Sequence, residues 1–174
     1  MRALCWGPTD GRLALCLHGF PDSAHGWRLL GPMLAQHGMR VVAPFTRGYW
    51  PTELPDDGDY HMGALMADAL ALHRHFNGGD DAILIGHDWG AWTTNAIAAL
   101  PKSPFGTHIS LALPPVRAID PSVHPLGRRL IMAAIQLRMS WYIPFFQIPA
   151  LPLMALAETA QCCSSKVLTV WHRC

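Results

Sequence analysis

Short apolar runs alternate along the chain with longer segments in which apolar residues recur at helical spacing. Each run is followed by polar or glycine-rich residues, as is typical of a buried strand that ends in a loop. Four runs fit this description: 12–17, 40–45, 82–85 and 108–113. Because strands of a parallel sheet are buried on both faces, they read as continuous apolar runs. The pattern therefore predicts a mostly parallel sheet.

The segments between these runs predict helices. Residues 23–36 have helical spacing, although Gly31 and Pro32 interrupt it, and residues 60–76 place Met62, Leu65, Met66 and Ala69 on one face. Asn77-Gly78-Gly79 ends the second segment, as expected at a helix C-terminus. Two more helices are predicted, over 91–100 and, after Pro114-Pro115, over 122–139. Strands that alternate with helices predict an α/β fold with helices flanking the sheet.

Three polar loops follow the first three runs. They contain residues 18–20, 46–48 and 87–89. In open α/β sheets, ligands bind beyond the carboxyl ends of the strands. We therefore expect these loops to converge on one rim of the sheet and to form the functional site.

Asp88 stands between a predicted strand and a predicted helix, in the sequence Gly-His-Asp-Trp-Gly. Gly86 and Gly90 allow a tight strand-to-helix turn that would lift the side chain of residue 88 above the sheet, as in a nucleophile elbow. The helix N-terminus would stabilise an anion there by about 0.3–1 kcal/mol at an exposed site. A second interpretation stays open, in which Asp88 only caps the helix.

Three motifs in this order and spacing resemble the α/β-hydrolase superfamily, and within it the epoxide hydrolases and their haloalkane dehalogenase relatives. They are LHGFPDSAHGW, RGY and GHDWGA, and the resemblance extends over residues 4–157. It implies a partial α/β-hydrolase fold, a mostly parallel sheet with flanking helices followed by the start of a helical lid. The expected divisions are the N-terminal part of the core (1–115), a partial lid or cap (116–157) and an atypical, frameshifted or disordered tail (158–174).

The resemblance also implies roles for individual residues. Asp88 would be the nucleophile that forms an alkyl-enzyme ester. The backbone N–H groups of Phe20 and Trp89 would form the oxyanion hole when that ester is hydrolysed. Tyr142, in the aromatic segment SWYIPFFQ, matches a lid tyrosine that protonates the departing epoxide oxygen. An aromatic packing role for Tyr142 remains the alternative.

Other residues of the motifs would support the site. His18 would stabilise its loop, or be no more than a hydrogen-bonded loop histidine, and His87 is expected to pack beside the turn. Arg47 is expected to anchor its loop. The supporting set is His18, Gly19, Pro21, Gly86, His87 and Gly90.

The resemblance leaves the reaction open between two substrates. Haloalkane dehalogenases usually carry Asn or Glu after the His-Gly pair, whereas this chain has Phe20. Opening of a small apolar epoxide is therefore the first hypothesis and haloalkane hydrolysis the second. A third hypothesis is a non-catalytic truncated remnant, in which Asp88 contributes only to stability.

The rest of the family's catalytic triad is expected beyond the lid, in the order nucleophile, acid, histidine. The late histidines of this chain, His108, His124 and His172, do not stand in that context, and no acid follows the fourth run. We therefore expect a truncated chain whose ester on Asp88 would not turn over, unless a second polypeptide supplies the histidine. The missing strands would leave an unpaired sheet edge open to self-association.

Composition restricts the remaining classes. The 174 residues are 51% hydrophobic with a formal net charge of +1, which predicts one folded domain and no nucleic-acid footprint. No stretch of about 18 apolar residues predicts a membrane span, and no apolar run of signal length opens the chain. Five cysteines without a CxxC pair favour reduced thiols in a cytoplasmic protein. No metal-ligand spacing, phosphate loop or dinucleotide motif is present, so no metal and no cofactor are expected.

Overall fold

The computed structural model describes residues 1–56, 58–113 and 125–140. These residues belong to two units, which we describe separately. The first unit contains a five-stranded sheet with its helices, and the second contains one helix. Tyr142 and the predicted tail lie outside the described residues, and the expected domain boundaries stay a prediction.

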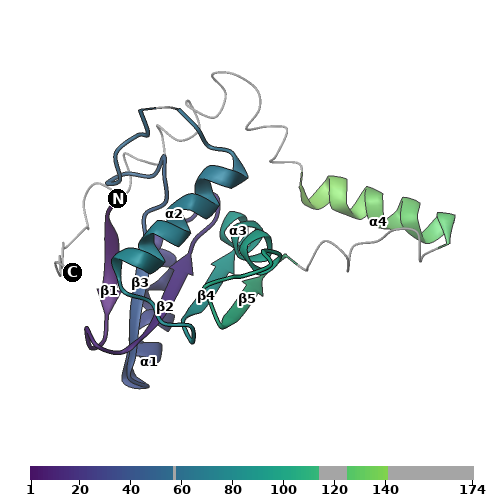
Figure 1. The fold of residues 1–174 in the computed structure, drawn as a ribbon. Helices are drawn as coiled ribbons and strands as arrows, with labels where there is room; N and C mark the ends of the chain where they lie inside the picture. Colours follow the sequence, from purple (N-terminus) through teal and green to yellow (C-terminus); the bar gives the residue numbers. More distant parts are fainter. Residues whose placement is uncertain (57, 114–124, 141–174) are drawn as a thin grey trace. The chain divides into compact units, whose positions relative to one another are not determined.

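The sheet consists of β1 (Ala3–Trp6), β2 (Arg12–Leu17), β3 (Met39–Pro44), β4 (Ile83–His87) and β5 (Thr107–Leu111). Its spatial order is β1-β3-β2-β4-β5 (Figure 1). Strands β2 to β5 are parallel to their neighbours, and β1 pairs antiparallel with β3. This architecture confirms the predicted mostly parallel sheet. All four apolar runs form strands, with boundaries shifted by at most two residues.

The strand order places the predicted loops at a topological switch point. From β2 the chain crosses to β3 on one side, whereas β4 lies on the other side of β2 and leads to β5. The loops after β2 and β4 therefore start from adjacent strands and lead the chain toward opposite edges of the sheet. Crevices at such points are where open α/β sheets bind ligands.

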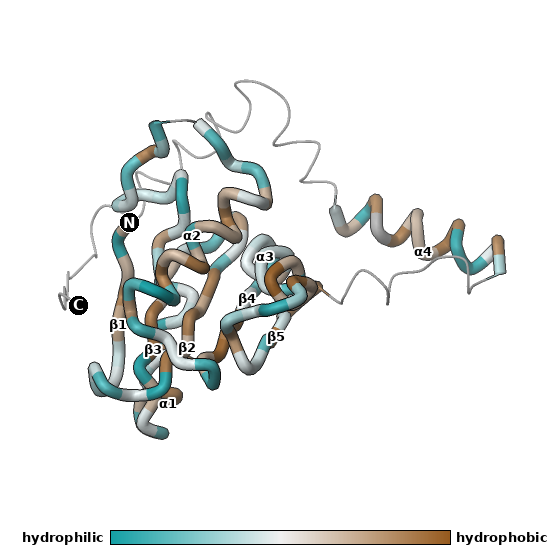
Figure 2. Tube along the Cα trace, in the orientation of Figure 1, coloured by the Kyte–Doolittle hydropathy of each residue, from teal (hydrophilic) through white to brown (hydrophobic). Residues whose placement is uncertain are grey.

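Helices cover both faces of this sheet. Helix α1 (Leu30–Gln36) and the 3-10 helix η1 (Ala24–Arg28) contact β1 and β3, whereas α2 (Met62–His75) and α3 (Trp89–Ala98) contact each other and β2. Side chains of β2 alternate between two separate cores. Leu13, Leu15 and Leu17 belong to the core beneath α2 and α3, and Ala14 and Cys16 belong to the core beneath α1. Figure 2 shows the resulting contrast between hydrophobic strands and hydrophilic loops.

The segment predicted as one helix over 23–36 is two helices in the structure. It breaks at Leu29, and Gly31 and Pro32 lie in the first turn of α1. Proline is tolerated there because its missing N–H would have no intrahelical acceptor. A Cβ on Gly31 would collide with the ring of Trp6, so glycine lets α1 approach β1 closely.

Strand β5 lies at the edge of the sheet, and its exposure alternates along its length. Ile109 and Leu111 remain 39% and 41% exposed on one face. The expected unpaired edge is therefore present among the described residues, while self-association through it stays a prediction.

The second unit contains α4 (Leu126–Met139), which lies within the helix predicted over 122–139. The first residues of that predicted helix lie outside the described part. None of the described helices combines the length and the apolar character needed to cross a bilayer.

The expectation of reduced thiols is wrong for Cys5, which is disulfide-bonded. Disulfide formation depends on the approach of two cysteines in space, which spacing along a sequence does not reveal. Cys16 is a free thiol buried within β2. Burial raises its pKa to about 12.

Candidate active site

Asp88 occupies a sharp turn between β4 and α3. Its backbone has φ 54° and ψ −115°, a conformation that non-glycine residues rarely adopt. Its N–H donates to the carbonyl of Leu111 at 3.3 Å, and its carbonyl accepts the first helical hydrogen bond, from Trp92. Residue 88 is therefore held at the carboxyl end of the sheet by β5 on one side and α3 on the other.

Three glycines make room for this turn. A Cβ on Gly86 would collide with the backbone of Gly90, and one on Gly90 would collide with the carbonyl of Leu17. A Cβ on Gly19 would collide with the Asp88 side chain itself. The turn thus packs directly against the end of β2 and the loop that follows it.

The Asp88 side chain meets the loop after β2. The backbone N–H of Phe20 donates a hydrogen bond of 2.9 Å to Asp88 Oδ1. Although Asp88 is the N-cap residue of α3, its carboxylate makes no capping hydrogen bond to that helix. This carboxylate is therefore directed across the switch point and not into its own helix, and two of the three predicted loops meet there.

His18 stabilises the loop from below. Its ring is almost fully buried, and Nδ1 lies 2.9 Å from the carbonyl of Gly19, which can only accept. The backbone N–H of Thr46 donates to Nε2 at 3.2 Å. His18 is therefore neutral with its proton on Nδ1. Burial lowers its pKa, outweighing the opposing effects of the Gly19 hydrogen bond and the Asp22 carboxylate.

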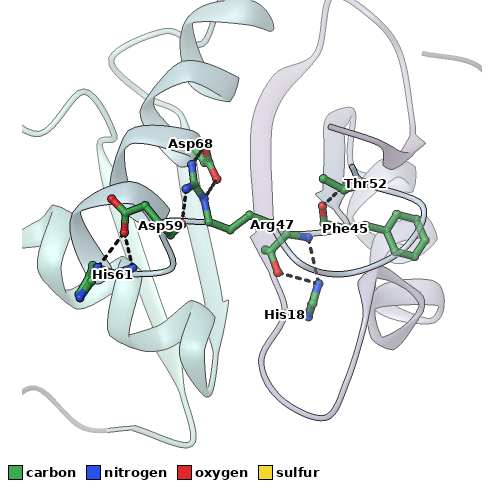
Figure 3. A network of polar contacts seen from close by, with 8 residues as sticks. His18, Phe45, Arg47, Thr52, Asp59, His61 and Asp68 are labelled. Carbon is green, nitrogen blue, oxygen red and sulfur yellow. Dashed lines mark hydrogen bonds and ion pairs between the residues drawn. The ribbon is translucent and has the colours of Figure 1, made fainter. Parts of the chain in front are cut away.

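Arg47 fastens the third loop to α2 (Figure 3). Its Nε and Nη2 donate to the two carboxylate oxygens of Asp68, at 2.6 and 2.7 Å. The two side chains are only 14% and 23% exposed. Such bidentate, charge-assisted pairs are geometrically specific. The prediction that Arg47 anchors its loop agrees with this contact, whereas sequence analysis did not single out Asp68 or Thr46.

The remainder of this loop is tied down at both ends. Thr52 Oγ1 donates to the carbonyl of Phe45 at 2.6 Å. Asp59 Oδ1 accepts from the backbone N–H of His61 at 2.8 Å and contacts the His61 ring (Figure 3). The backbone hydrogen bond is the main reason that the pKa of Asp59 is lowered.

Tyr49 belongs to the site, although sequence analysis gave the RGY motif no role beyond Arg47. Its ring packs edge-on against that of His18, with centroids 4.6 Å apart. Burial raises the pKa of its phenol to about 12, and the carboxylates of Asp88 and Asp22 add to the effect. The phenol therefore stays protonated within the field of Asp88. The signal available in the sequence was the position of Tyr49 in the loop that follows a predicted strand.

A cavity of about 30 Å³ lies beneath the turn, between the ends of β2 and β3 and helices α2 and α3. Its polar lining comes from His18, Thr46, Asp68 and Thr93. The volume suffices for about one water molecule and is far too small for an organic substrate. Asp88 is not among the residues that line it, although Trp89 and Gly90, which follow Asp88, are.

The other predicted residues fall around Asp88. Trp89 begins α3, so its N–H is among the helix amides that lack an intrahelical acceptor. Its side chain is 53% exposed beside Asp88. Pro21 follows Phe20 through a cis peptide bond, and His87 ends β4 half-buried. No cluster of three metal-ligand side chains occurs among the described residues.

Similarity to known proteins identifies the family of this chain. Residues 15–134 match the family described as the alpha/beta hydrolase fold. The AB hydrolase superfamily protein YfhM of Bacillus subtilis is 32% identical over 156 residues, covering 87% of this chain and 51% of that protein. Epoxide hydrolase B of Mycobacterium tuberculosis is 32% identical over 146 residues, covering 66% and 41%. The crystal structure of epoxide hydrolase VrEH1 from Vigna radiata superposes with a TM-score of 0.66 at 30% identity, covering 86% and 47%.

The chain therefore belongs to the α/β-hydrolase family, and epoxide hydrolases are among its relatives. This membership confirms the resemblance inferred from the motifs. The chain spans about half the length of the relatives it matches.

Proposed function

We propose that the chain carries the nucleophile half of an epoxide hydrolase site, in which Asp88 attacks a carbon of a small apolar epoxide. The observation that carries this proposal is the direction of the Asp88 carboxylate. It lies above a strand-to-helix turn, accepts the Phe20 N–H and leaves its own helix uncapped. An Asp that served only as a cap would bond the N–H groups of α3.

The hydrogen bond assigns different tasks to the two carboxylate oxygens. Oδ1 is held by Phe20, so Oδ2 forms the new bond to carbon while the epoxide C–O bond breaks. The departing oxygen takes a proton from the phenol of Tyr142, which regains one from solvent; Tyr142 lies outside the described residues. Oδ1 becomes the ester carbonyl oxygen, and the N–H groups of Phe20 and Trp89 would stabilise the negative charge it gains when water attacks.

Epoxide is favoured over haloalkane for two reasons. Several relatives of about 30% identity are named epoxide hydrolases. The residue after His18-Gly19 is Phe20, which offers the substrate only its backbone N–H and no halide-binding side chain. Haloalkane hydrolysis through the same ester remains the second candidate.

Turnover needs a base that activates water, and neither His18 nor His108 is placed to act as one. His18 uses both ring nitrogens, for Gly19 and Thr46. His108 pairs with Leu84 of β4, four residues before Asp88. At the rise per residue of a strand, this places the His108 backbone about 13 Å from the Asp88 turn. We therefore expect an alkyl adduct to accumulate at Asp88, with diol release depending on a base from outside the described residues.

Incubation with styrene oxide and intact-mass measurement tests this proposal. The wild-type chain is expected to gain the mass of one epoxide, and peptide mapping is expected to place it on Asp88. Asp88→Asn should lose this adduct, whereas Asp10→Asn, at an exposed position of the same unit, should keep it. Failure of Asp88 to react would favour the non-catalytic interpretation. An alkyl adduct from a haloalkane, with halide release, would favour the second candidate.

A further inference from the structure

Beyond the proposed nucleophile, we propose that Arg47 and Asp68 are positioning residues that aim the Asp88 carboxylate, acting through Thr46, His18 and the loop that presents the Phe20 amide. This inference rests on the proposed function of Asp88, because it concerns the orientation of that side chain. It is carried by a series of hydrogen bonds, joined by the peptide links 46–47 and 19–20, that connects helix α2 to the turn after β4.

The first step of the series fixes the start of the loop after β3. Arg47 donates two hydrogen bonds to Asp68 on α2 and one to the backbone carbonyl of Asp59. Three donors from one planar guanidinium, bound to a helix and to the far end of the loop, leave the Arg47 backbone little freedom. Thr46, the preceding residue, is thereby held just beyond the end of β3.

The second step selects the form of His18. The Thr46 N–H lies 3.2 Å and its Oγ1 3.1 Å from Nε2 of His18. A backbone N–H can only donate, so Nε2 must be unprotonated and Nδ1 must carry the proton. Displacement of the Thr46 N–H would remove the hydrogen bond that holds His18 in one tautomer and one ring orientation.

The third step shapes the loop that carries Phe20. The Gly19 carbonyl accepts from His18 Nδ1 at 2.9 Å and from the Asp22 N–H at 3.2 Å. The Gly19 carbonyl and the Phe20 N–H belong to one peptide group, so these two bonds orient that group directly. That peptide group contains the N–H that binds Asp88 Oδ1. Gly19 also packs against the Asp88 side chain, so a displaced turn would displace the carboxylate.

The test compares Arg47→Met and Asp68→Asn with Arg12→Met. Arg12 also pairs with an aspartate, Asp81, but at the opposite end of β2. In ¹H–¹⁵N spectra, Arg47→Met and Asp68→Asn should both shift the Phe20 amide and lose the single Nδ1–H tautomer of His18. Their single-turnover rate of adduct formation should fall about tenfold to a hundredfold, the size of effect that follows a small misplacement of a reacting group. Arg12→Met should preserve both.

Asp68→Asn removes the same ion pair by its other partner and serves if Arg47→Met does not fold. Thr46→Val is a control, because valine keeps the backbone N–H that selects the tautomer and should keep the Nδ1–H form of His18. An unchanged Phe20 amide and an unchanged His18 tautomer in Arg47→Met or Asp68→Asn would overturn the inference. Absence of an adduct in the wild type would instead refute the proposed function. The spectra would still decide whether the Arg47–Asp68 pair positions Phe20 and Asp88.

Discussion

The backbone amide of Phe20 donates to Asp88 Oδ1 across 68 positions of sequence. This contact joins the loop after β2 to the turn after β4, which are adjacent strands at the switch point of the sheet. It holds one carboxylate oxygen and leaves the other available. The following predictions concern the elements that create this relationship.

The backbone of Asp88 should carry measurable strain. Residues held in sparsely populated φ/ψ regions cost roughly 1–3 kcal/mol. Because Asp88→Gly and Asp88→Ala both remove the carboxylate, they differ mainly in the backbone freedom of residue 88. We expect the glycine variant to exceed the alanine variant by about 1–2 kcal/mol in the free energy of unfolding, measured with urea. Ala67→Gly, at an exposed position inside α2, should show the opposite sign, since glycine destabilises a helix interior.

The close approach at Gly90 should not tolerate a methyl group. A Cβ there would collide with the Leu17 carbonyl of β2. Gly90→Ala is expected to lower the free energy of unfolding by about 1–3 kcal/mol, as overpacking does. Gly63→Ala in α2 is the matched control, because nothing lies within 4 Å of its Cβ position. Equal stability of the two variants in thermal unfolding would contradict the tight turn.

His18 should make the fold sensitive to mild acid. Burial lowers its pKa below the ordinary value of 6.5, so between the folded and unfolded pKa values the unfolded chain binds more protons. Its contribution to stability is therefore complete above about pH 6.5 and is lost as pH falls from there toward the folded pKa. The slope should not exceed about 1.4 kcal/mol per pH unit for this one group.

An NMR titration of the His18 ring checks this prediction directly. The ring should stay in the Nδ1–H tautomer below pH 6.5, because protonation would place an N–H against the Thr46 donor. His108, whose pKa is also lowered by burial, must be followed separately. A midpoint for His18 at or above 6.5 would contradict the neutral, doubly bonded ring.

Cys16 should be inert in the native chain. Its pKa is raised to about 12 by burial, and the thiolate is the reactive form of cysteine. Iodoacetamide at neutral pH should leave Cys16 unmodified until denaturant is added, as judged by peptide mass. This result also matters for the epoxide experiment, because it excludes Cys16 as the site of a native-state adduct. Rapid native modification would show that the core beneath α1 opens readily.

Much of the fold could be predicted from local pattern. The apolar run Arg12–Leu17 is β2 with the same boundaries, and Asn77-Gly78-Gly79 follows the end of α2. The sharp turn at Asp88 could also be predicted, because glycines two residues before and after it allow close packing. These features depend on sterics and burial over a few residues, so the sequence itself contains the relevant information.

Helix boundaries in the first part of the chain were less predictable. Residues 23–36 share one apolar spacing, yet they form η1 and α1 because the segment must pack over β1 and β3. Periodicity identifies the buried positions but not the point at which a helix changes direction. The disulfide of Cys5 was equally invisible, since it depends on distance in space.

The sequence alone determined which residue occupies the sharp turn and which loops follow the strands. Only the tertiary structure decided that Arg47 would pair with Asp68, 21 positions away, and that Thr46 would set the tautomer of His18, 28 positions away. Residues at such separations become neighbours only when the order and register of the strands are established. That order results from the packing of whole elements, and no short stretch of residues encodes it.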